Sequence, residues 1–429
     1  MSLALNNARA ADGRLKTQLV LADQAMISAA NFAIGVLLAR YLGPAAYGAF
    51  VLSYNIVLFI GGLHGALVFS PMMVLGAARS GLAAQEYFSA VLVYELVLCL
   101  TFVLMMIVGV AGANMLAPQW GLNSLLAPLA FAAGNSHFQE FWRRYLFVQD
   151  FPASALFNDF ITYGLRCALL AGFGVAIGLN TNSALWIIGA SCVAGFLTSV
   201  PAFARRWPMV PGRAGLLSVA REHWVFGKWL VAEILVYWCS GQLVIYVSAQ
   251  LISVSAVGAM TAAQSIVAAT HVLLMALENF VPSRAANMYV QHGEAGLIRY
   301  MRRVTLLGGA CVLGIVAVGS VWAEFWLQLF FGQAYRGNGW IVPWWGGFYL
   351  LSFLQRPFSV GLRVLGHTKG MFLATASSAV VAMTVSYPLI KNWGLHGSML
   401  ALCLVQGTAV AVVALSFRKT LRSRRTAAA

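Results

Sequence analysis

The chain has 429 residues, of which 61% are hydrophobic and only 9% are charged, and its mean hydropathy is +0.80. So little charge cannot cover a water-facing surface, which excludes a soluble globular protein and predicts a polytopic membrane protein. The net charge is +15, but about 22 of the 27 Lys and Arg residues fall in alternate loops or in the two tails, a positive-inside pattern that argues against nucleic-acid binding.

Apolar runs of about 20 residues, the length needed to cross a bilayer, predict an all-α protein with about twelve transmembrane helices. The basic loops place both termini and residues 204–227 on the cytoplasmic side, where they face anionic lipid headgroups, and place Arg40 and Arg336 on the periplasmic side. The runs lie near residues 17–39, 48–69, 88–111, 124–147, 153–178, 183–203, 228–250, 254–282, 301–323, 340–363, 370–390 and 396–417.

The sequence Gly43-Pro44 separates the first two runs, because Pro lacks an N–H and restricts the residue before it. The surrounding sequence recurs later in the chain: residues 23–57 align with residues 233–267 at a constant offset of 210 residues. We therefore predict two related six-helix bundles, residues 1–203 and 228–429, that insert the same way up. A parallel repeat of this kind favours a transport site between the halves.

Residues 204–227 are predicted to form a cytoplasmic linker between the bundles. Within it, residues 215–226 favour an amphipathic helix lying on the inner leaflet. The alternative is an irregular linker whose aromatic side chains snorkel to the membrane surface. The tail from Arg418 to Arg425 is a second basic segment at the cytoplasmic surface.

The fifth span carries a polar stripe inside the bilayer, where each ionisable side chain costs at least about 2.5–3.5 kcal/mol. Spacings of three, four and seven place the stripe on one helix face, so it must face a neighbouring helix or a water-filled cavity. Arg166 lies near the bilayer midplane, and it either lines a cavity or forms a buried pair with Asp159. The stripe consists of Asn158, Asp159, Thr162, Tyr163 and Arg166.

Two spans of the second half carry similar stripes. The tenth span has Tyr349, Ser352, Arg356, Ser359 and Arg363, and the eighth has Thr261, Gln264, His271 and Glu278. Guanidinium groups bind phosphate oxygens bidentately, and a low dielectric strengthens that attraction. We therefore predict that Arg166 and Arg356 line one central cavity for an anionic cargo. The other predicted substrate-binding residues are Tyr163, Gln264, His271 and Tyr349.

Several carboxylates lie near the predicted inner ends of spans: Asp23, Glu95, Glu140, Glu233 and Glu278. Asp23 and Glu233 are equivalent in the repeat, so we predict that they act at the inner gate or in ion coupling. Asp159 and Glu278 are further candidates for this role. The alternative is that such acids pair with nearby arginines, such as Arg143, Arg144 and Arg284.

The six cysteines stand singly inside apolar runs. No spacing of metal ligands appears among them, and a disulfide framework is not expected. The sequence accordingly predicts no catalytic residue, no metal site and no cofactor.

The turn Leu38-Ala39-Arg40-Tyr41-Leu42-Gly43-Pro44-Ala45-Ala46-Tyr47-Gly48 resembles the turn after the first span of polysaccharide-transport proteins. These proteins belong to the multidrug/oligosaccharidyl-lipid/polysaccharide (MOP) exporter superfamily. The sequence Phe331-Gly332-Gln333-Ala334-Tyr335 is similar to the Phe-Gly-x-x-Tyr that precedes the tenth span in the same family. The resemblance implies a MATE-like, V-shaped fold of two bundles that alternates between inward-open and outward-open states.

The resemblance also implies a function. The polysaccharide-transport proteins that the chain resembles are flippases rather than enzymes. They move polyprenyl-pyrophosphate-linked oligosaccharides from the cytoplasmic to the periplasmic leaflet of the bacterial inner membrane for surface polysaccharide biosynthesis. The implied partners are the lipid-linked oligosaccharide, anionic membrane lipids and polysaccharide polymerase machinery.

Other functions remain open. An ion-coupled multidrug or small-molecule antiporter of the same superfamily would carry midplane Asp or Glu without midplane Arg. A polysaccharide polymerase or ligase would need a large outward loop. A major facilitator protein would carry Gly-x-x-x-Asp after the second span, where this chain has no acid between Pro71 and Gly81. A non-transporting scaffold would leave Arg166 without a purpose.

Overall fold

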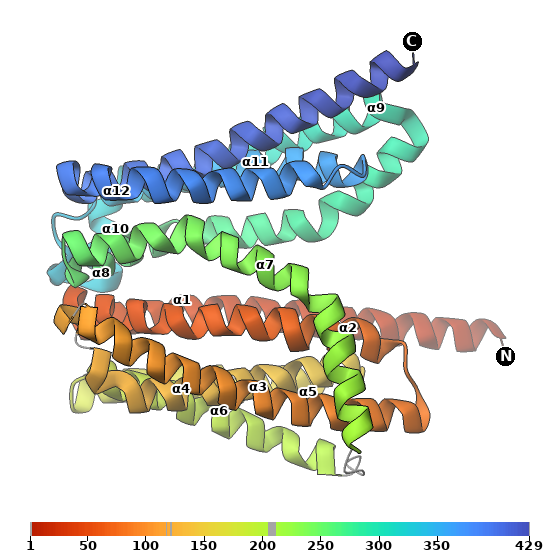
Figure 1. Ribbon diagram of the computed structural model, residues 1–429, viewed down its shortest axis with the longest axis horizontal. Coiled ribbons are helices and arrows are strands. Elements are labelled where there is room, and N and C mark those ends of the chain that lie inside the picture. Colours follow the sequence, from red (N-terminus) through yellow and green to blue (C-terminus); the bar gives the residue numbers. More distant parts are fainter. Residues whose placement is uncertain (1, 117, 121, 205–211, 429) are drawn as a thin grey trace. The chain divides into compact units, whose positions relative to one another are not determined.

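The computed structural model describes residues 2–116, 118–120, 122–204 and 212–428, and every regular element in these ranges is a helix (Figure 1). The chain divides into two compact units. One comprises Met1–Leu42 and Ala49–Ile234, and the other comprises Gly43–Gly48 and Leu235–Ala429. The basic start of the predicted linker, residues 205–211, lies outside the described residues.

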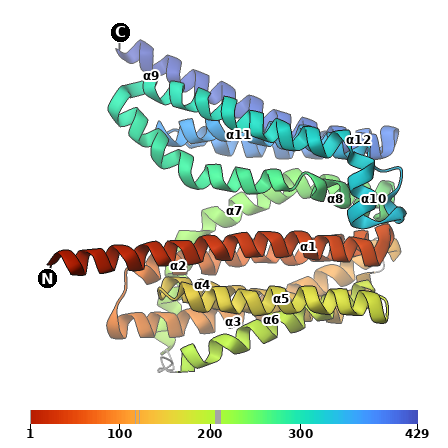
Figure 2. The ribbon, with the colours of Figure 1, turned by 180° about the vertical axis from the view of Figure 1, so that it is seen from behind.

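The first unit contains α1 except for Gly43–Gly48, then α2 to α6 and the start of α7. Within it α4 packs against α3, α5 and α6, and α5 also packs against α6 (Figure 2). Side chains of α4 can therefore reach several neighbouring helices. The elements are α1 (Ser2–His64), the π-helix η1 (Gly65–Phe69), α2 (Ser70–Ala77), α3 (Gly81–Leu116), the 3-10 turns η2 (Pro118–Trp120) and η3 (Leu122–Leu125), α4 (Leu126–Val148), α5 (Pro152–Ala176), α6 (Thr181–Ala204) and α7 (Arg213–Leu251).

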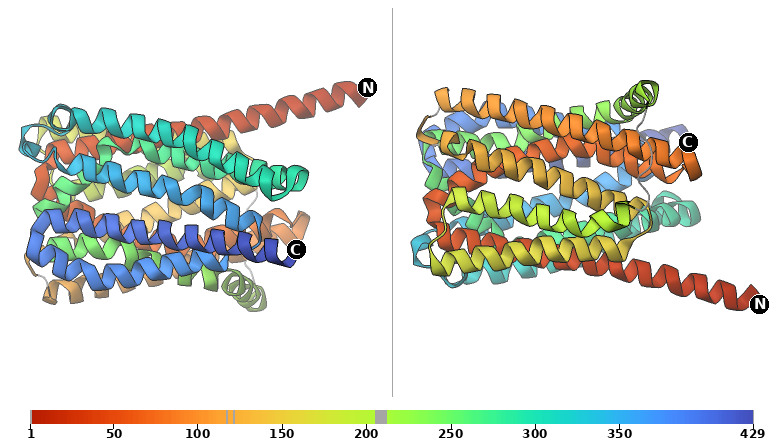
Figure 3. Two further views of the ribbon diagram at one scale, coloured as in Figure 1. Left: turned by 90° about the horizontal axis from the view of Figure 1, so that it is seen from above. Right: turned by 90° about the horizontal axis from the view of Figure 1, so that it is seen from below.

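The second unit is built mainly from the end of α7 and five further helices. In it α11 packs against both α9 and α12 (Figure 3). Two of its helices are bent sharply, α9 at Gly293 and α12 at Gly394, where φ is positive. The elements are α8 (Val254–Ile266), α9 (Ala269–Val321), α10 (Ala323–Phe331), the 3-10 turn η4 (Gln333–Tyr335), α11 (Ile341–Val364) and α12 (Lys369–Ala428).

Seven of the described helices are long and apolar enough to cross a membrane. Three of them are bent at a glycine, Gly43, Gly293 or Gly394, so each holds all or part of two predicted spans. The predicted eighth span, residues 254–282, is also interrupted: α8 ends at Ile266 and α9 begins at Ala269. The prediction of an all-α membrane protein is confirmed, and the helices divide near the predicted loops.

The predicted break at Gly43 is present in α1. Gly43 has φ 71° and ψ 172°, and Pro44 directly follows it at the start of the next helical segment. Glycine adopts positive φ without steric cost. Proline fits the first turn of a helix because the N–H group that it lacks would have no hydrogen-bond partner within the helix there. Ser253, which lies 210 residues after Gly43, caps the start of α8 by accepting a hydrogen bond from the Ala256 N–H. A helix break therefore occurs at both copies of the repeat, through a positive φ at Gly43 and an extended N-cap at Ser253.

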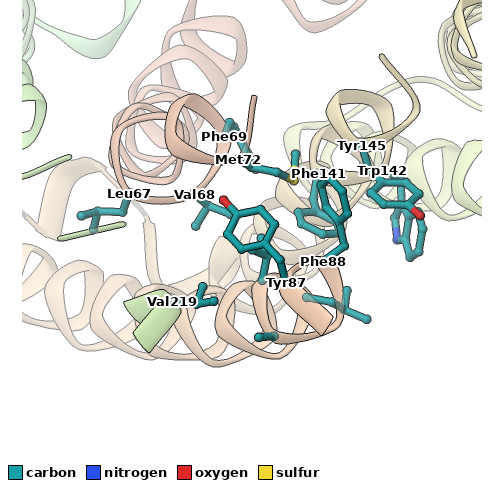
Figure 4. Close-up of a cluster of buried hydrophobic side chains, with 13 residues drawn as sticks. Leu67, Val68, Phe69, Met72, Tyr87, Phe88, Phe141, Trp142, Tyr145 and Val219 are labelled. Carbon is teal, nitrogen blue, oxygen red and sulfur yellow. The ribbon is translucent and has the colours of Figure 1, made fainter. Parts of the chain in front are cut away.

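The predicted amphipathic helix is the beginning of α7, which continues without interruption to Leu251. One of its faces packs on protein rather than on lipid, because Val219 is 5% exposed and joins the core where α2, α3 and α4 meet (Figure 4). His223 is fully buried there, with Nδ1 2.8 Å from the Leu67 carbonyl oxygen and Nε2 2.8 Å from the Tyr87 hydroxyl. Leu217 and Trp224 stay exposed. The linker is thus an extension of a span docked on the first unit.

The sequence Phe331 to Tyr335 forms a tight turn between α10 and η4. Phe331 and Tyr335 are buried with their ring centroids 5.8 Å apart, and Gly332 between them has φ 90°. Glu324 accepts hydrogen bonds from the N–H groups of Gly337 and Gly339 at 2.7 and 3.0 Å. Burial alone would raise the pKa of Glu324, but these donors hold that pKa below its ordinary value. The motif is therefore a packing and turn signature.

Candidate functional site

A buried ionic network occupies the first unit where α1, α4 and α5 meet. Arg143 of α4 donates from Nε to Asp159 of α5 at 2.5 Å and from Nη2 to Asp23 of α1 at 2.8 Å. Both carboxylates are fully buried, and the Arg143 side chain is 8% exposed. Arg143 also lies 3.4 Å from Glu140, which is part-exposed and pairs with Arg144. One guanidinium therefore holds together three helices through two buried acids.

The two buried acids have different surroundings. Gln139 donates to the Asp159 Oδ1 atom at 3.0 Å, so both oxygens of Asp159 are hydrogen-bonded. The Oδ1 atom of Asp23 is buried and has no hydrogen-bond partner, although Gln24 reaches its Oδ2 atom at 3.3 Å. With both acids ionised, the cluster of Arg143, Asp23 and Asp159 has a net charge of −1, because one guanidinium faces two carboxylates. Asp23 is therefore the acid with one carboxylate oxygen that accepts no hydrogen bond.

The network continues through neutral groups to α6. Gln139 donates to the Asn158 side-chain oxygen at 2.8 Å, and Asn158 donates to the Gly195 carbonyl and the Ser199 hydroxyl, each at 2.7 Å. The predicted stripe on α5 thus faces neighbouring helices. Its polar groups find partners there, as groups buried away from water require.

Arg166 lies on the same face of α5 and is 6% exposed. Its Nε donates to the Ser191 hydroxyl at 3.0 Å, and its guanidinium carbon lies 5.2 Å from the centre of the Tyr163 ring. The ion pairs of the described residues include none to Arg166, and Asp159, its proposed partner, is bound to Arg143 instead. Arg166 is therefore a buried cation held by neutral groups.

The polar residues of the second unit form two smaller groups. Arg356 of α11 pairs with Glu278 of α9, and both side chains are about one-third exposed. Gln264 of α8 lies 3.5 Å from the hydroxyl of Tyr349, which is 7% exposed. His271 is exposed in the first turn of α9, just after the interruption between α8 and α9. Among the hydrogen bonds and ion pairs that the structure gives for these residues, none joins the Arg356–Glu278 pair to Gln264 and Tyr349.

Asp23 and Glu233 are placed differently, although they are equivalent in the repeat. Asp23 is fully buried in the network around Arg143, whereas Glu233 is exposed on α7. The pairing of shallow acids with nearby arginines, left open by the sequence, is realised for Asp23 with Arg143 and for Glu140 with Arg144.

Three buried histidines were not singled out in the sequence. His64 and His223 are fully buried and His137 is 5% exposed. The signal that could have found His64 and His137 is the one applied to Arg166, an ionisable side chain inside a predicted span. His223 lies in the predicted linker, where that signal does not apply. His64 and Glu95 are hydrogen-bonded at 2.9 Å, with the His137 ring stacked on that of His64.

Solved structures share this arrangement of helices. An inward-facing multidrug resistance MATE family transporter of the MOP superfamily superposes with a TM-score of 0.72 at 15% identity, over 93% of this chain and 96% of that one. The fold is the MATE fold. A MATE crystal structure in the straight conformation gives 0.62 at 17% identity, over 97% and 96% of the two chains. A MOP superfamily transporter from Pyrococcus furiosus, described as having a binding pocket of reverse polarity, gives 0.58 at 14% identity, over 97% and 95%.

The MatE family also matches in sequence, over residues 230–388, which cover most of the second half. No curated protein sequence matches the chain. The MATE fold agrees with the two-bundle architecture that the repeat predicted. The V shape and the cavity between the halves depend on how the two units are placed, and they stay predictions.

Proposed function

We propose that the protein is an ion-coupled exporter that uses the MATE fold to move a small organic molecule across the membrane. Two of the similar structures are MATE transporters, one of them a multidrug resistance protein. The observation that carries the ion coupling is the buried Asp23–Arg143–Asp159 network, in which two acids share one guanidinium. We place the protein in a bacterial inner membrane with both termini in the cytoplasm, from the distribution of basic residues.

The coupling group in this proposal is Asp23. A buried carboxylate is costly unless paired, and Arg143 can neutralise only one of the two acids. A proton or a monovalent cation on the free Oδ1 atom of Asp23 would remove the excess charge, and its release would restore it. Because Arg143 links α1 to α4 and α5, a change of charge at Asp23 alters the contact that holds three helices together. That link connects ion binding to helix movement.

The test uses proteoliposomes that contain the full-length protein, with ethidium as an organic-cation probe and an imposed gradient of H⁺ or Na⁺. We expect one gradient to drive ethidium transport, and Asp23→Asn to reduce the gradient-driven component at least about tenfold. Glu233→Gln, at the equivalent but exposed position, serves as the control and should retain coupling. An Asp23→Asn protein that responds to the gradient like the wild type would remove Asp23 from the coupling role. Transport of ethidium that no gradient affects would overturn the proposal.

A second candidate cargo is a polyprenyl-pyrophosphate-linked oligosaccharide, with polysaccharide polymerase machinery as the partner. The observation that favours it is a local excess of positive charge on α11, where part-exposed Arg356 and exposed Arg363 lie on one face and only Glu278 pairs with Arg356. Diphosphate oxygens suit such guanidinium groups. Arg166 and Arg356 remain the predicted contacts in a central cavity for this cargo.

The second candidate is tested with vesicles that hold a fluorescent polyprenyl-diphosphate glycolipid. We expect Arg356→Ala and Arg166→Ala to slow its movement between leaflets about ten- to a hundredfold, since a charge-assisted contact contributes about 1.5–3 kcal/mol. The Lys variants should recover part of the rate, because Lys keeps the charge without the fork. Alanine variants that fold and still move the glycolipid at the wild-type rate would exclude this contact set.

A further inference from the structure

A second cluster of ionisable side chains lies in the first unit and takes no part in the Arg143 network. It joins His64 at the end of α1, Glu95 and Cys99 on α3, and His137 on α4. Glu95 and Cys99 are four residues apart, so they share a face of their helix. His64 directly precedes the π-helix η1, and such local widening of a helix occurs frequently at functional sites.

The cluster brings metal-binding atoms together in a closed place. One ligand atom each from His64, Glu95 and Cys99 lies within 4.8 Å of the others. His64 and Glu95 are fully buried, and the Nδ1 atom of His64 is 2.9 Å from Glu95 Oε2. The His137 ring stacks on that of His64 with centroids 4.8 Å apart and planes 16° apart. The ring of Phe102 lies edge-on to His64 at 5.0 Å and closes another side.

Three polar atoms in this cluster are buried and have no hydrogen-bond partner: His64 Nε2, Glu95 Oε1 and His137 Nε2. Native proteins satisfy nearly all such atoms, and each exception costs about 1–3 kcal/mol. Cys99 is weakly engaged, since its sulfur is 3.6 Å from the Gly134 carbonyl oxygen. A single added proton could serve only one of these atoms, whereas a metal ion can bind several at once.

We propose that His64, Glu95 and Cys99 bind one divalent transition metal ion of the Zn²⁺ class, with the stacked His137 ring covering the site. The donor types decide the class, because Zn²⁺ is held by imidazole nitrogen, thiolate and carboxylate, usually with four ligands. Mg²⁺ and Ca²⁺ prefer oxygen ligands throughout. Two anionic ligands, the Glu95 carboxylate and the Cys99 thiolate, neutralise the two charges of the ion. The filled site is therefore neutral, as a low-dielectric interior requires.

The proposed ion links α1 and α3, and the His137 ring of α4 stacks beside it. It would be a structural centre, because His64 and Glu95 are fully buried. A metal ion that binds the folded chain but not the unfolded chain raises the free energy of unfolding, so the site should stabilise the first unit. This inference does not depend on the cargo or on Asp23, and its test uses no transport measurement.

The experiment measures metal bound to the full-length protein in detergent after exposure to Zn²⁺ and removal of loosely bound ions. We expect about one Zn²⁺ per chain in the wild type. Cys99→Ser and Glu95→Gln should each lower Zn²⁺ affinity at least about tenfold. Removing a residue that merely hydrogen-bonds to a metal ligand already lowers affinity by about that factor, and these two residues are ligands themselves. Cys403→Ser is the matched control, since Cys403 is also part-buried and its sulfur lies 3.7 Å from the Trp344 carbonyl oxygen. The control should bind Zn²⁺ like the wild type.

Two further readouts keep the test decisive where a variant folds poorly. The Co²⁺-loaded wild type should show a thiolate-to-metal absorption band that is lost in Cys99→Ser and kept in Cys403→Ser. The wild-type protein, measured without any variant, should unfold at a higher temperature with Zn²⁺ than with EDTA. Mg²⁺ should give no such shift. A wild type that retains no Zn²⁺, or Zn²⁺ binding that Cys99→Ser leaves unchanged, would overturn the proposal.

Discussion

Replacing Arg143 with Met should destabilise the first unit by about 3–5 kcal/mol, the cost of breaking a buried ion pair from one side. The arginine is the charged partner of both Asp23 and Asp159, and neither acid is exposed. Without the guanidinium, two carboxylates remain in a low-dielectric interior and must be protonated or hydrated at the expense of packing. The measurement is the free energy of unfolding in mixed micelles, titrated with a denaturing detergent.

The neighbouring Arg144→Met variant is the control for this prediction. Arg144 pairs with Glu140 at 2.6 Å, but its side chain is 38% exposed, so its loss should cost no more than about 1 kcal/mol. Adding Asp23→Asn and Asp159→Asn to Arg143→Met should recover part of the lost stability, because the stranded charges are then gone. Equal stability of the Arg143→Met and Arg144→Met proteins would mean that the network is not a structural link.

The sequence contains enough to predict much of this fold. Helix-length apolar runs located the spans, because apolar periodicity is a local property of the chain. Gly43 and the repeat located the breaks at Gly43 and Ser253. The helical spacing of the stripe on α5 predicted that it faces either a neighbouring helix or a water-filled cavity, and in the structure its polar groups meet α4 and α6. Spacing along one helix says which residues share a face, but it does not say which helix that face meets.

That limit explains what the sequence could not predict. The sequence offered Arg166, on the same helix, as an ion-pair partner for Asp159. In the structure Asp159 pairs with Arg143 of α4 instead. The repeat made Asp23 and Glu233 equivalent, but only Asp23 is enclosed by neighbouring helices. The proposed metal ligands come from two helices far apart in the sequence, so no Cys or His spacing could reveal them.

The two equivalent glycines of the repeat, Gly48 and Gly258, make the second prediction of a large effect. They lie 210 residues apart and pack reciprocally within the second unit. A Cβ added at Gly48 would overlap the carbonyl oxygen of Val254, and one added at Gly258 would overlap that of Pro44. A backbone carbonyl cannot turn aside as a flexible side chain can. We therefore expect Gly48→Ala and Gly258→Ala each to cost about 1–3 kcal/mol of unfolding free energy.

The control is Gly35→Ala on the same helix as Gly48, where an added Cβ meets nothing within 4 Å. Alanine favours the helix there, so this variant should be neutral or more stable by about 0.5–1 kcal/mol. Gly48 and Gly258 share one close crossing, as small residues commonly do where membrane helices meet. Once the first alanine has pushed the helices apart, the second should cost less, so the double variant should lose less than the sum of the single losses. Strictly additive losses would mean that the two glycines do not share a contact.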